Sequence, residues 1–169
     1  MSRFGQSGTG RPLPDEAGEL RLHHDPEGRP VPNSAHPVAG FAHSYPDGQY
    51  VSRHHHDYAQ LLYASSGVMR VETTVGFWVV PPQRAVWIPA RMGHEITMAG
   101  ATEMRSLYLL DGLEGLPSDC RVIAVSPLLR ELIAAFIAGP AAYAPEGPQA
   151  RLAAVILDQL RAPVLAGLH

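Results

Sequence analysis

Short apolar segments that alternate with turn-forming residues occupy the middle of the chain, from about residue 38 to 125. Gly, Pro, Ser and Asp separate these segments and favour turns. Segments this short with turns this regular are typical of an all-β sandwich or barrel. Nothing between them is long enough for a crossover helix, so we expect largely antiparallel pairing. The predicted strands are Val38–His43, Ala59–Ala64, Val68–Glu72, Phe77–Val80, Ala85–Ile88, His94–Met98, Met104–Leu110 and Cys120–Val125.

The apolar pattern changes to a helical period from about residue 126. Ser126 and Pro127 fit an N-cap and the first helical position, and Gly139 ends the segment. A second helix is predicted for residues 148–161, before Pro163. Each helix has an apolar stripe, which packs either on the chain's own barrel or against a second copy of the chain. In the second case, a homodimer interface forms from Leu152, Val155, Ile156 and Leu160.

Residues 1–37 lack apolar periodicity and are rich in Gly and Pro. Such a segment buries too little surface to offset its ordering entropy, so we predict an extended or disordered arm. The chain then divides into an arm (1–37), a β-barrel (38–125) and a two-helix segment (126–169).

Composition excludes several classes of protein. The net charge of −3 argues against direct contact with nucleic acid, and the single Cys excludes an internal disulfide. No apolar run approaches about 18 residues, so no membrane span is predicted. The N-terminus has no apolar signal core, and we therefore expect a cytoplasmic protein.

Three of the nine histidines form a run, His54-His55-His56. If residues 54–62 are one strand, His54 and His56 share a face with Gln60, because strand side chains alternate. His94 opens a later strand. Two histidines, an amide oxygen and a third histidine form a plausible ligand set for Zn, Ni, Cu, Mn or Fe. A pocket that binds an organic ligand without metal, or an inert polar core, are the alternative interpretations. The candidate metal ligands are His54, His56, Gln60 and His94.

An effector pocket is expected beside these groups. Tyr58, Leu62 and Met98 share faces with the candidate ligands, while the faces of Trp87 and Tyr108 are not fixed by the pattern. Three neutral imidazoles and a neutral amide would leave a dication its full charge, which favours an anionic effector or hydroxide. The candidate ligand-binding residues are therefore Tyr58, Leu62, Met98, Trp87 and Tyr108.

The spacing from Gly48 through the histidine run to Gln60 and Gly67 resembles the first cupin motif, with Gln60 where that motif has Glu. Pro89–His94 is similar to the second motif. It departs from the pattern at Gln83, Arg91 and Met98, where the motif has Gly, Gly and Asn. The resemblance implies a mainly β fold, a cupin double-stranded β-helix barrel, followed by two C-terminal helices.

Longer strings resemble the N-terminal sensing domain of AraC-type transcriptional regulators over about residues 38–161: Tyr45–Gly48, His54–Ala64, Trp78–Ala90 and Val125–Ile133. The resemblance implies a small-molecule effector in the barrel, homodimerisation through the helices, and DNA binding by a separate C-terminal helix-turn-helix domain. The chain ends at His169, which leaves too little sequence for such a domain of about 100 residues. We therefore expect no direct DNA contact by this chain.

A small metal-dependent cupin enzyme (a dioxygenase, isomerase or lyase) is the alternative function, with the same four ligands holding a catalytic metal. The two helices extend beyond what a minimal barrel enzyme needs, and no convincing general acid or base accompanies the ligands. The sequence therefore favours the non-enzymatic sensor.

Overall fold

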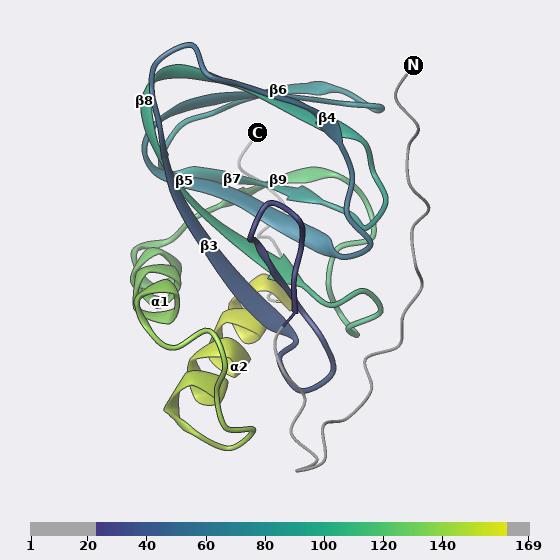
Figure 1. Ribbon diagram of the computed structural model, residues 1–169, viewed down its shortest axis with the longest axis vertical. Coiled ribbons are helices and arrows are strands. Elements are labelled where there is room, and N and C mark those ends of the chain that lie inside the picture. The colour runs from purple at the N-terminus through teal and green to yellow at the C-terminus, as the bar shows by residue number, and fades with distance from the viewer. Residues whose placement is uncertain (1–22, 162–169) are drawn as a thin grey trace.

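The computed structural model describes residues 23–161, in which the strands curve into a barrel and two helices pack under one side (Figure 1). Residues 1–22 of the predicted arm and residues 162–169 lie outside the described part. The strands are β1 (His23–His24), β2 (Pro30–Val31), β3 (Val38–Tyr45), β4 (Tyr50–His54), β5 (Ala59–Thr73), β6 (Phe77–Val80), β7 (Arg84–Ile88), β8 (His94–Leu109) and β9 (Arg121–Ala124). The helices are α1 (Pro127–Ala138) and α2 (Pro148–Arg161).

Strands β5 and β8 form the centre of a seven-stranded antiparallel sheet. The order is β3-β8-β5-β7-β9, with β4 also paired to β8 and β6 also paired to β5. The two long strands pair along most of their length and bend, so they take part in both walls of the barrel (Figure 1). The predicted mainly β cupin barrel followed by two helices is confirmed.

Two predicted turns are bends inside long strands. Gly67 in β5 and Gly100 in β8 both have a φ of 83°, which favours glycine, and the register of β5 against β8 shifts around Ser66. Irregular pairing of this kind bends a strand without ending it. The two segments predicted on either side of each glycine therefore form one continuous strand.

Residues 54–62 do not form the single strand that was the condition for a shared face of His54, His56 and Gln60, because the chain breaks there. β4 ends at His54 and β5 begins at Ala59, with residues 55–58 connecting them. His54 pairs in register with His94 of β8, so the barrel closes around both ends of this connection.

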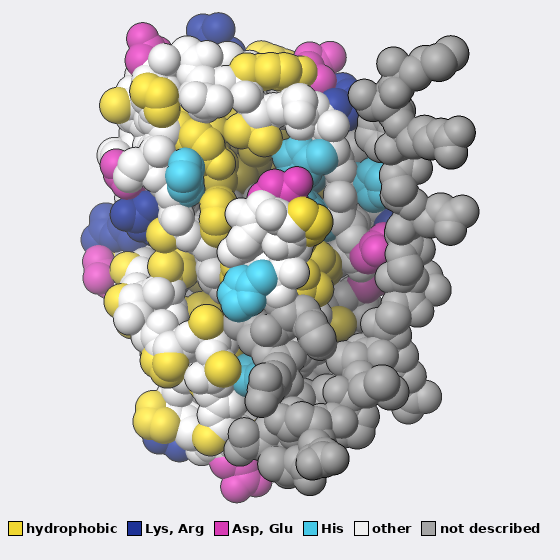
Figure 2. Space-filling model, in the orientation of Figure 1, with side chains coloured by type: hydrophobic (Ala, Val, Ile, Leu, Met, Phe, Trp, Pro, Cys, Tyr) yellow, Lys and Arg dark blue, Asp and Glu magenta, His cyan; other side chains and the backbone are white. Residues whose placement is uncertain are grey.

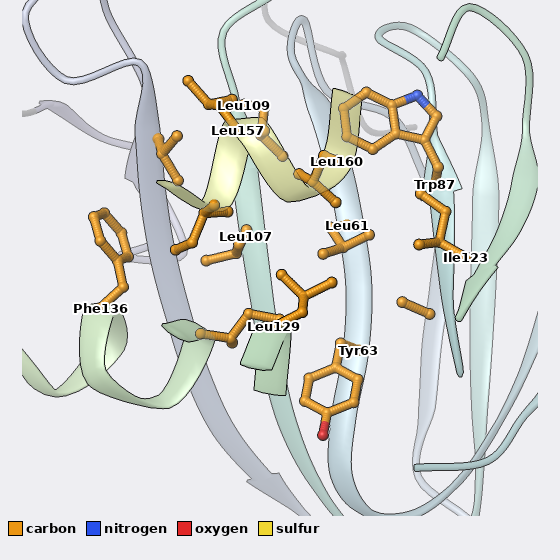
Figure 3. Packing of buried hydrophobic residues seen from close by; sticks show 14 of the residues in the cluster. Leu61, Tyr63, Trp87, Leu107, Leu109, Ile123, Leu129, Phe136, Leu157 and Leu160 are labelled. Carbon is orange, nitrogen blue, oxygen red and sulfur yellow. The ribbon is translucent and has the colours of Figure 1, made fainter. Parts of the chain in front are cut away.

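Side chains of the central strands alternate between two apolar clusters. From β5, Leu62 points into the barrel lumen, whereas Leu61 and Tyr63 pack against the helices (Figure 3). The lumen cluster includes Leu62, Met69, Val71, Val86, Ile88, Ile96, Met98 and Met104. The helix-side cluster includes Leu61, Tyr63, Trp87, Leu107, Leu109, Leu129, Ile133, Phe136, Ile156 and Leu160.

Both helices begin close to the predicted positions. The side chain of Ser126 caps α1 by accepting a hydrogen bond from the backbone N–H of Leu129 at 3.1 Å. Gln149 of α2 donates from Nε2 to the carbonyl oxygen of Phe136 at 2.5 Å, which joins the two helices. Among the described residues, neither helix is long and apolar enough to cross a membrane.

The apolar stripe of α2 packs mainly against the core of its own chain. Ile156 and Leu160 are buried in the helix-side cluster, Leu152 packs against it, and Val155 is 39% exposed. Of the four residues predicted for a dimer interface, Ile156 and Leu160 are therefore occupied by the chain's own barrel.

The last part of the predicted arm is ordered. β1 and β2 form a hairpin, and Asn33 and His36 that follow it are buried. In the hairpin loop, the Asp25 carboxylate accepts from the backbone N–H of Arg29 at 2.8 Å and from its Nε at 2.5 Å. Local side-chain hydrogen bonds of this kind fix a short segment that has no apolar periodicity.

Candidate metal centre and ligand pocket

Three histidines meet at one end of the barrel. His54 ends β4, His56 lies in the connection to β5, and His94 begins β8. One ring nitrogen from each lies within 4.8 Å of the others. His94 and His56 are buried and His54 is half-buried. Figure 2 shows histidine side chains beside an apolar hollow on the face that the hairpin crosses in Figure 1.

Backbone carbonyls fix the rings of two of these histidines. Nδ1 of His54 lies 2.7 Å from the carbonyl oxygen of Ser52, and Nδ1 of His94 lies 3.0 Å from that of Met92. A carbonyl oxygen only accepts, so the proton is on Nδ1 and the lone pair is on Nε2. Nε2 of His94 and Nε2 of His56 are both buried and have no hydrogen-bond partner within residues 23–161.

The protein environment keeps these imidazoles neutral. Burial lowers the pKa of His56 to about 3 and the pKa of His94 to about 4, and it also lowers the pKa of His54. The charges that the histidines would place on one another act in the same direction. Neutral imidazole is the form that binds a metal.

Gln60 adds an oxygen to the same lumen. It is 3% exposed, and its Nε2 donates to the hydroxyl of Ser106 at 3.3 Å. That bond leaves Oε1 buried without a partner. Among residues 23–161, the predicted ligand set thus contains three buried polar atoms without a hydrogen-bond partner, which is unfavourable unless another group satisfies them.

Two tyrosines form an aromatic wall beside the histidines. The ring of Tyr58 stacks on that of His56, with centroids 5.0 Å apart and planes 11° apart. Tyr108 lies 5.4 Å from His56 and 5.2 Å from Tyr58 between ring centroids. Burial raises the pKa of both phenols, that of Tyr58 to about 12. Both are therefore neutral and can donate hydrogen bonds.

The other predicted ligand-binding residues divide between the two faces of the sheet. Leu62 and Met98 belong to the lumen cluster. Trp87 pairs with Leu61 in the register of β7 and β5, and both lie in the helix-side cluster. The expectation that Trp87 lines the same pocket as the histidines is wrong, because strand side chains alternate and its neighbours Val86 and Ile88 take the inner face.

Arg29 is a site residue that the sequence did not reveal, because its segment was assigned to the arm. Val31 of the same hairpin packs against the Tyr58–Tyr108 pair. The Arg29 charge lies near enough to contribute to the lowered pKa of His54 and His56, after the effect of burial. Arg29 also pairs with the Asp25 and Glu27 carboxylates, at 2.5 and 3.0 Å. A basic residue in a turn carries no periodic signal that would place it here.

The donor set fits a first-row transition metal. Neutral imidazole nitrogens suit Zn, Cu, Fe and Ni, and their convergence on one point is the arrangement that a metal requires. Within the described residues, the group contains no carboxylate or thiol ligand. Burial raises the pKa of Cys120 to about 11, so this thiol is neutral near pH 7.

Comparison with known proteins places this architecture in one family. Residues 36–157 match the family described as the AraC-like ligand binding domain. Over 116 residues the chain is 31% identical to the HTH-type transcriptional regulator NimR of Escherichia coli (strain K12). That alignment covers 69% of this chain and 42% of the relative, so the chain spans about two fifths of the relative's length.

Similar solved structures include barrels from several proteins. A cupin superfamily protein from Desulfitobacterium hafniense has 22% sequence identity and a TM-score of 0.41, covering 54% of this chain and 100% of that one. A variant of oxalate decarboxylase from Bacillus subtilis has 18% identity and a TM-score of 0.41, covering 46% of this chain and 22% of that one.

Proposed function

Because this chain belongs to the AraC-like ligand-binding domain family, we propose that it binds a small-molecule effector in the barrel lumen and serves a transcriptional regulator. The observation that carries this proposal is the convergence of one ring nitrogen each from His54, His56 and His94 beside an aromatic wall. Such a lumen, apolar around a few convergent polar groups, is typical of a ligand pocket.

We assign His54, His56, Gln60 and His94 as ligands of a divalent transition metal. When bound, the metal supplies positive charge that attracts an anionic group of the effector. The carbonyl oxygens of Ser52 and Met92 hold the rings of His54 and His94 so that Nε2 faces the lumen. All four ligands are neutral, so the chain does not offset the charge of the cation.

The residues around the histidines favour an anionic effector with an apolar or aromatic part. The phenols of Tyr58 and Tyr108 offer aromatic faces and hydrogen-bond donors, and Leu62 and Met98 supply apolar contacts. The guanidinium of Arg29 also lies near the histidines, where the carboxylates of Asp25 and Glu27 already offset its charge. These residues select the effector by shape and charge.

The wider assembly follows from the family. We propose that the chain forms a homodimer in which α2 takes part, and that DNA is contacted by another part of the regulator. Val155 is the member of the predicted interface that α2 leaves exposed. The alternative, a small metal-dependent enzyme, uses the same histidines, but the match over residues 36–157 includes both barrel and helices and favours the regulator.

Metal content tests the ligand assignment directly. The full chain, prepared without a histidine tag, should bind Zn²⁺ or Ni²⁺ near one equivalent in equilibrium dialysis followed by elemental analysis. His54→Ala, His56→Ala and His94→Ala should each weaken binding by more than about 100-fold, since even outer partners of a metal site contribute about 10–100-fold.

The matched control is His55→Ala, which removes an exposed neighbour from the same run. It should bind metal as the unmodified chain does. Equal metal content in all four variants would refute the site. Bound metal should also raise the unfolding temperature of the control but not of His94→Ala, because a ligand stabilises only the state that binds it.

A further inference from the structure

A second cavity lies on the outer side of the barrel, between the end of β7 and the loop over residues 110–118 that follows β8. Its volume of about 360 Å³ is in the range of small-molecule pockets, about 300–1,000 Å³. Ala59 and Trp87 line it from strands whose neighbouring residues Gln60 and Ile88 point into the lumen. The sheet therefore separates this cavity from the histidines.

Trp87 lines this cavity and carries an unused hydrogen-bond donor. Its side chain is 1% exposed, and Nε1 is buried without a partner. An indole N–H only donates, and buried tryptophans usually find an acceptor. In Figure 3 the nitrogen lies at the edge of the helix-side cluster, turned away from Leu157 and Leu160. A ligand with an acceptor atom can supply the missing partner.

Arg91 brings positive charge to the same cavity. Its guanidinium is 61% exposed and uses Nη2 to pair with the Asp111 carboxylate at 2.8 Å. The other guanidinium nitrogens have no partner among residues 23–161. An exposed ion pair of this kind is weak and exchanges readily. The Arg91 guanidinium can therefore pair with the carboxylate of a ligand, either together with Asp111 or in place of it.

The backbone holds Arg91 in place at this rim. Its φ of 66° is uncommon for a residue other than glycine. The backbone N–H of Arg91 donates to the carbonyl oxygen of His56 at 2.6 Å, which stabilises this conformation. Residues held in sparsely populated conformations cluster at ligand sites and switch regions. The cavity thus has at its rim a charged residue whose backbone is held in place, and an aromatic residue in its wall.

We propose that this cavity is a second ligand site, which binds a compact planar organic anion. An acceptor atom at the edge of the ring accepts the Nε1 hydrogen of Trp87 in the plane of the indole, while the carboxylate pairs with the Arg91 guanidinium in the bidentate manner that these groups favour. Leu113 and Leu116 supply apolar contacts from the loop. The site is independent of the metal and the effector of the barrel lumen.

Quinoline carboxylates test this chemistry, because each combines a planar ring, a ring nitrogen acceptor and a carboxylate. The 3-, 4- and 6-carboxylates are titrated into the ¹⁵N-labelled full chain, and the indole N–H signals of Trp78 and Trp87 are followed by NMR. The variant Trp78→Phe assigns the two signals. At least one isomer should move the Trp87 signal to saturation at submillimolar concentration. 2-Naphthoate lacks the ring nitrogen and quinoline-3-carboxamide lacks the negative charge. Both should bind at least tenfold more weakly.

Variants separate this site from the lumen. Arg91→Gln should weaken binding at least tenfold, whereas Arg84→Gln, at an exposed arginine that begins β7, should not change it. Ala90→Leu fills the cavity and should abolish binding. His94→Ala, which disables the metal centre, should leave it unchanged.

Three outcomes overturn the proposal. They are no movement of the Trp87 signal with any isomer, equal affinity in Arg91→Gln, and binding that persists in Ala90→Leu but is lost in His94→Ala. The last outcome places the acid in the lumen. Circular dichroism checks that each variant folds, and Arg91→Gln alone decides the question if Ala90→Leu does not fold.

Discussion

Histidines that are buried without a partner make the metal-free protein sensitive to acid. His94 is 1% exposed and His56 is 8% exposed, so a proton on either ring would place a charge in the lumen. The low pKa of each follows from this burial. The same property that prepares these rings for a metal makes their protonated forms incompatible with the folded barrel.

The free energy of unfolding of the metal-free protein should fall as the pH is lowered. The unfolded chain takes up protons on these histidines near pH 6.5, while the folded chain does not until about pH 4 for His94 and 3 for His56. Stability is therefore present above pH 6.5 and is lost below it, by up to about 1.4 kcal/mol per pH unit for each histidine. Urea unfolding in the presence of a chelator, between pH 7.5 and 4.5, measures this slope.

His94→Gln should flatten this pH dependence, and His55→Gln, at the exposed neighbour, should not. An identical slope in His94→Gln and the unmodified chain would show that the acid sensitivity comes from other groups.

The two long strands depend on glycines that the chain pattern marks as turns. Gly67 and Gly100 share a φ of 83°, but their surroundings differ. A Cβ at Gly67 would lie 2.5 Å from the carbonyl oxygen of Ala101, whereas one at Gly100 would meet nothing within 4 Å. The bend in β5 therefore needs glycine for space as well as for conformation.

Substitution of these glycines should separate the two effects. Gly100→Ala should cost about 1–2 kcal/mol, the penalty of the left-handed conformation for a residue with a Cβ. Gly67→Ala should cost more, above about 3 kcal/mol, because the contact with backbone adds to that penalty. Chemical unfolding at pH 7.5 gives both values. Equal costs would mean that the strand shifts to make room.

At this scale the sequence predicts the kind of element better than its limits. Short apolar segments between turns identify β3 and β5 to β9, and the helical stripe identifies both helices, whereas β1, β2 and β4 are not predicted. Bends at Gly67 and Gly100 have the same local signal as turns, so continuity depends on pairing with a distant strand. The break after His54, which pairs with His94, likewise has no local signal in the sequence. The alternation pattern places Leu62 and Met98 on the lumen face, whereas Tyr58 lies in a connection outside any strand and the face of Trp87 requires the register of β7.

In the whole molecule, the helices pack against the outer face of the sheet, and the inner face of the same sheet lines the lumen. Ile156 is fully buried in the helix-side cluster, whereas Val155, its neighbour in α2, is 39% exposed. The two positions therefore distinguish folding from association. Sequence periodicity identified the stripe of α2 but could not tell whether the barrel or a partner covers it.

Val155→Asp should shift the proposed homodimer toward monomer in sedimentation velocity and change stability by less than about 0.5 kcal/mol, as exposed substitutions usually do. Ile156→Ala should lower the free energy of unfolding by about 2–5 kcal/mol, because it opens a cavity in the core. A chain that stays monomeric at all concentrations would rule out the dimer, and an unstable Val155→Asp variant would mean that this position also belongs to the core.

Side chains alternate along β5, so a single strand separates the lumen from the helices. Leu62 faces the lumen and Gln60 is buried on the same side of the strand, whereas Leu61 and Tyr63 of the same four consecutive residues pack in the helix-side cluster. A displacement of that backbone is felt on both sides at once. Communication between a molecule in the barrel and the helices therefore needs no relay of intermediate side chains, and the amide groups of residues 60–63 are where hydrogen exchange should report it first.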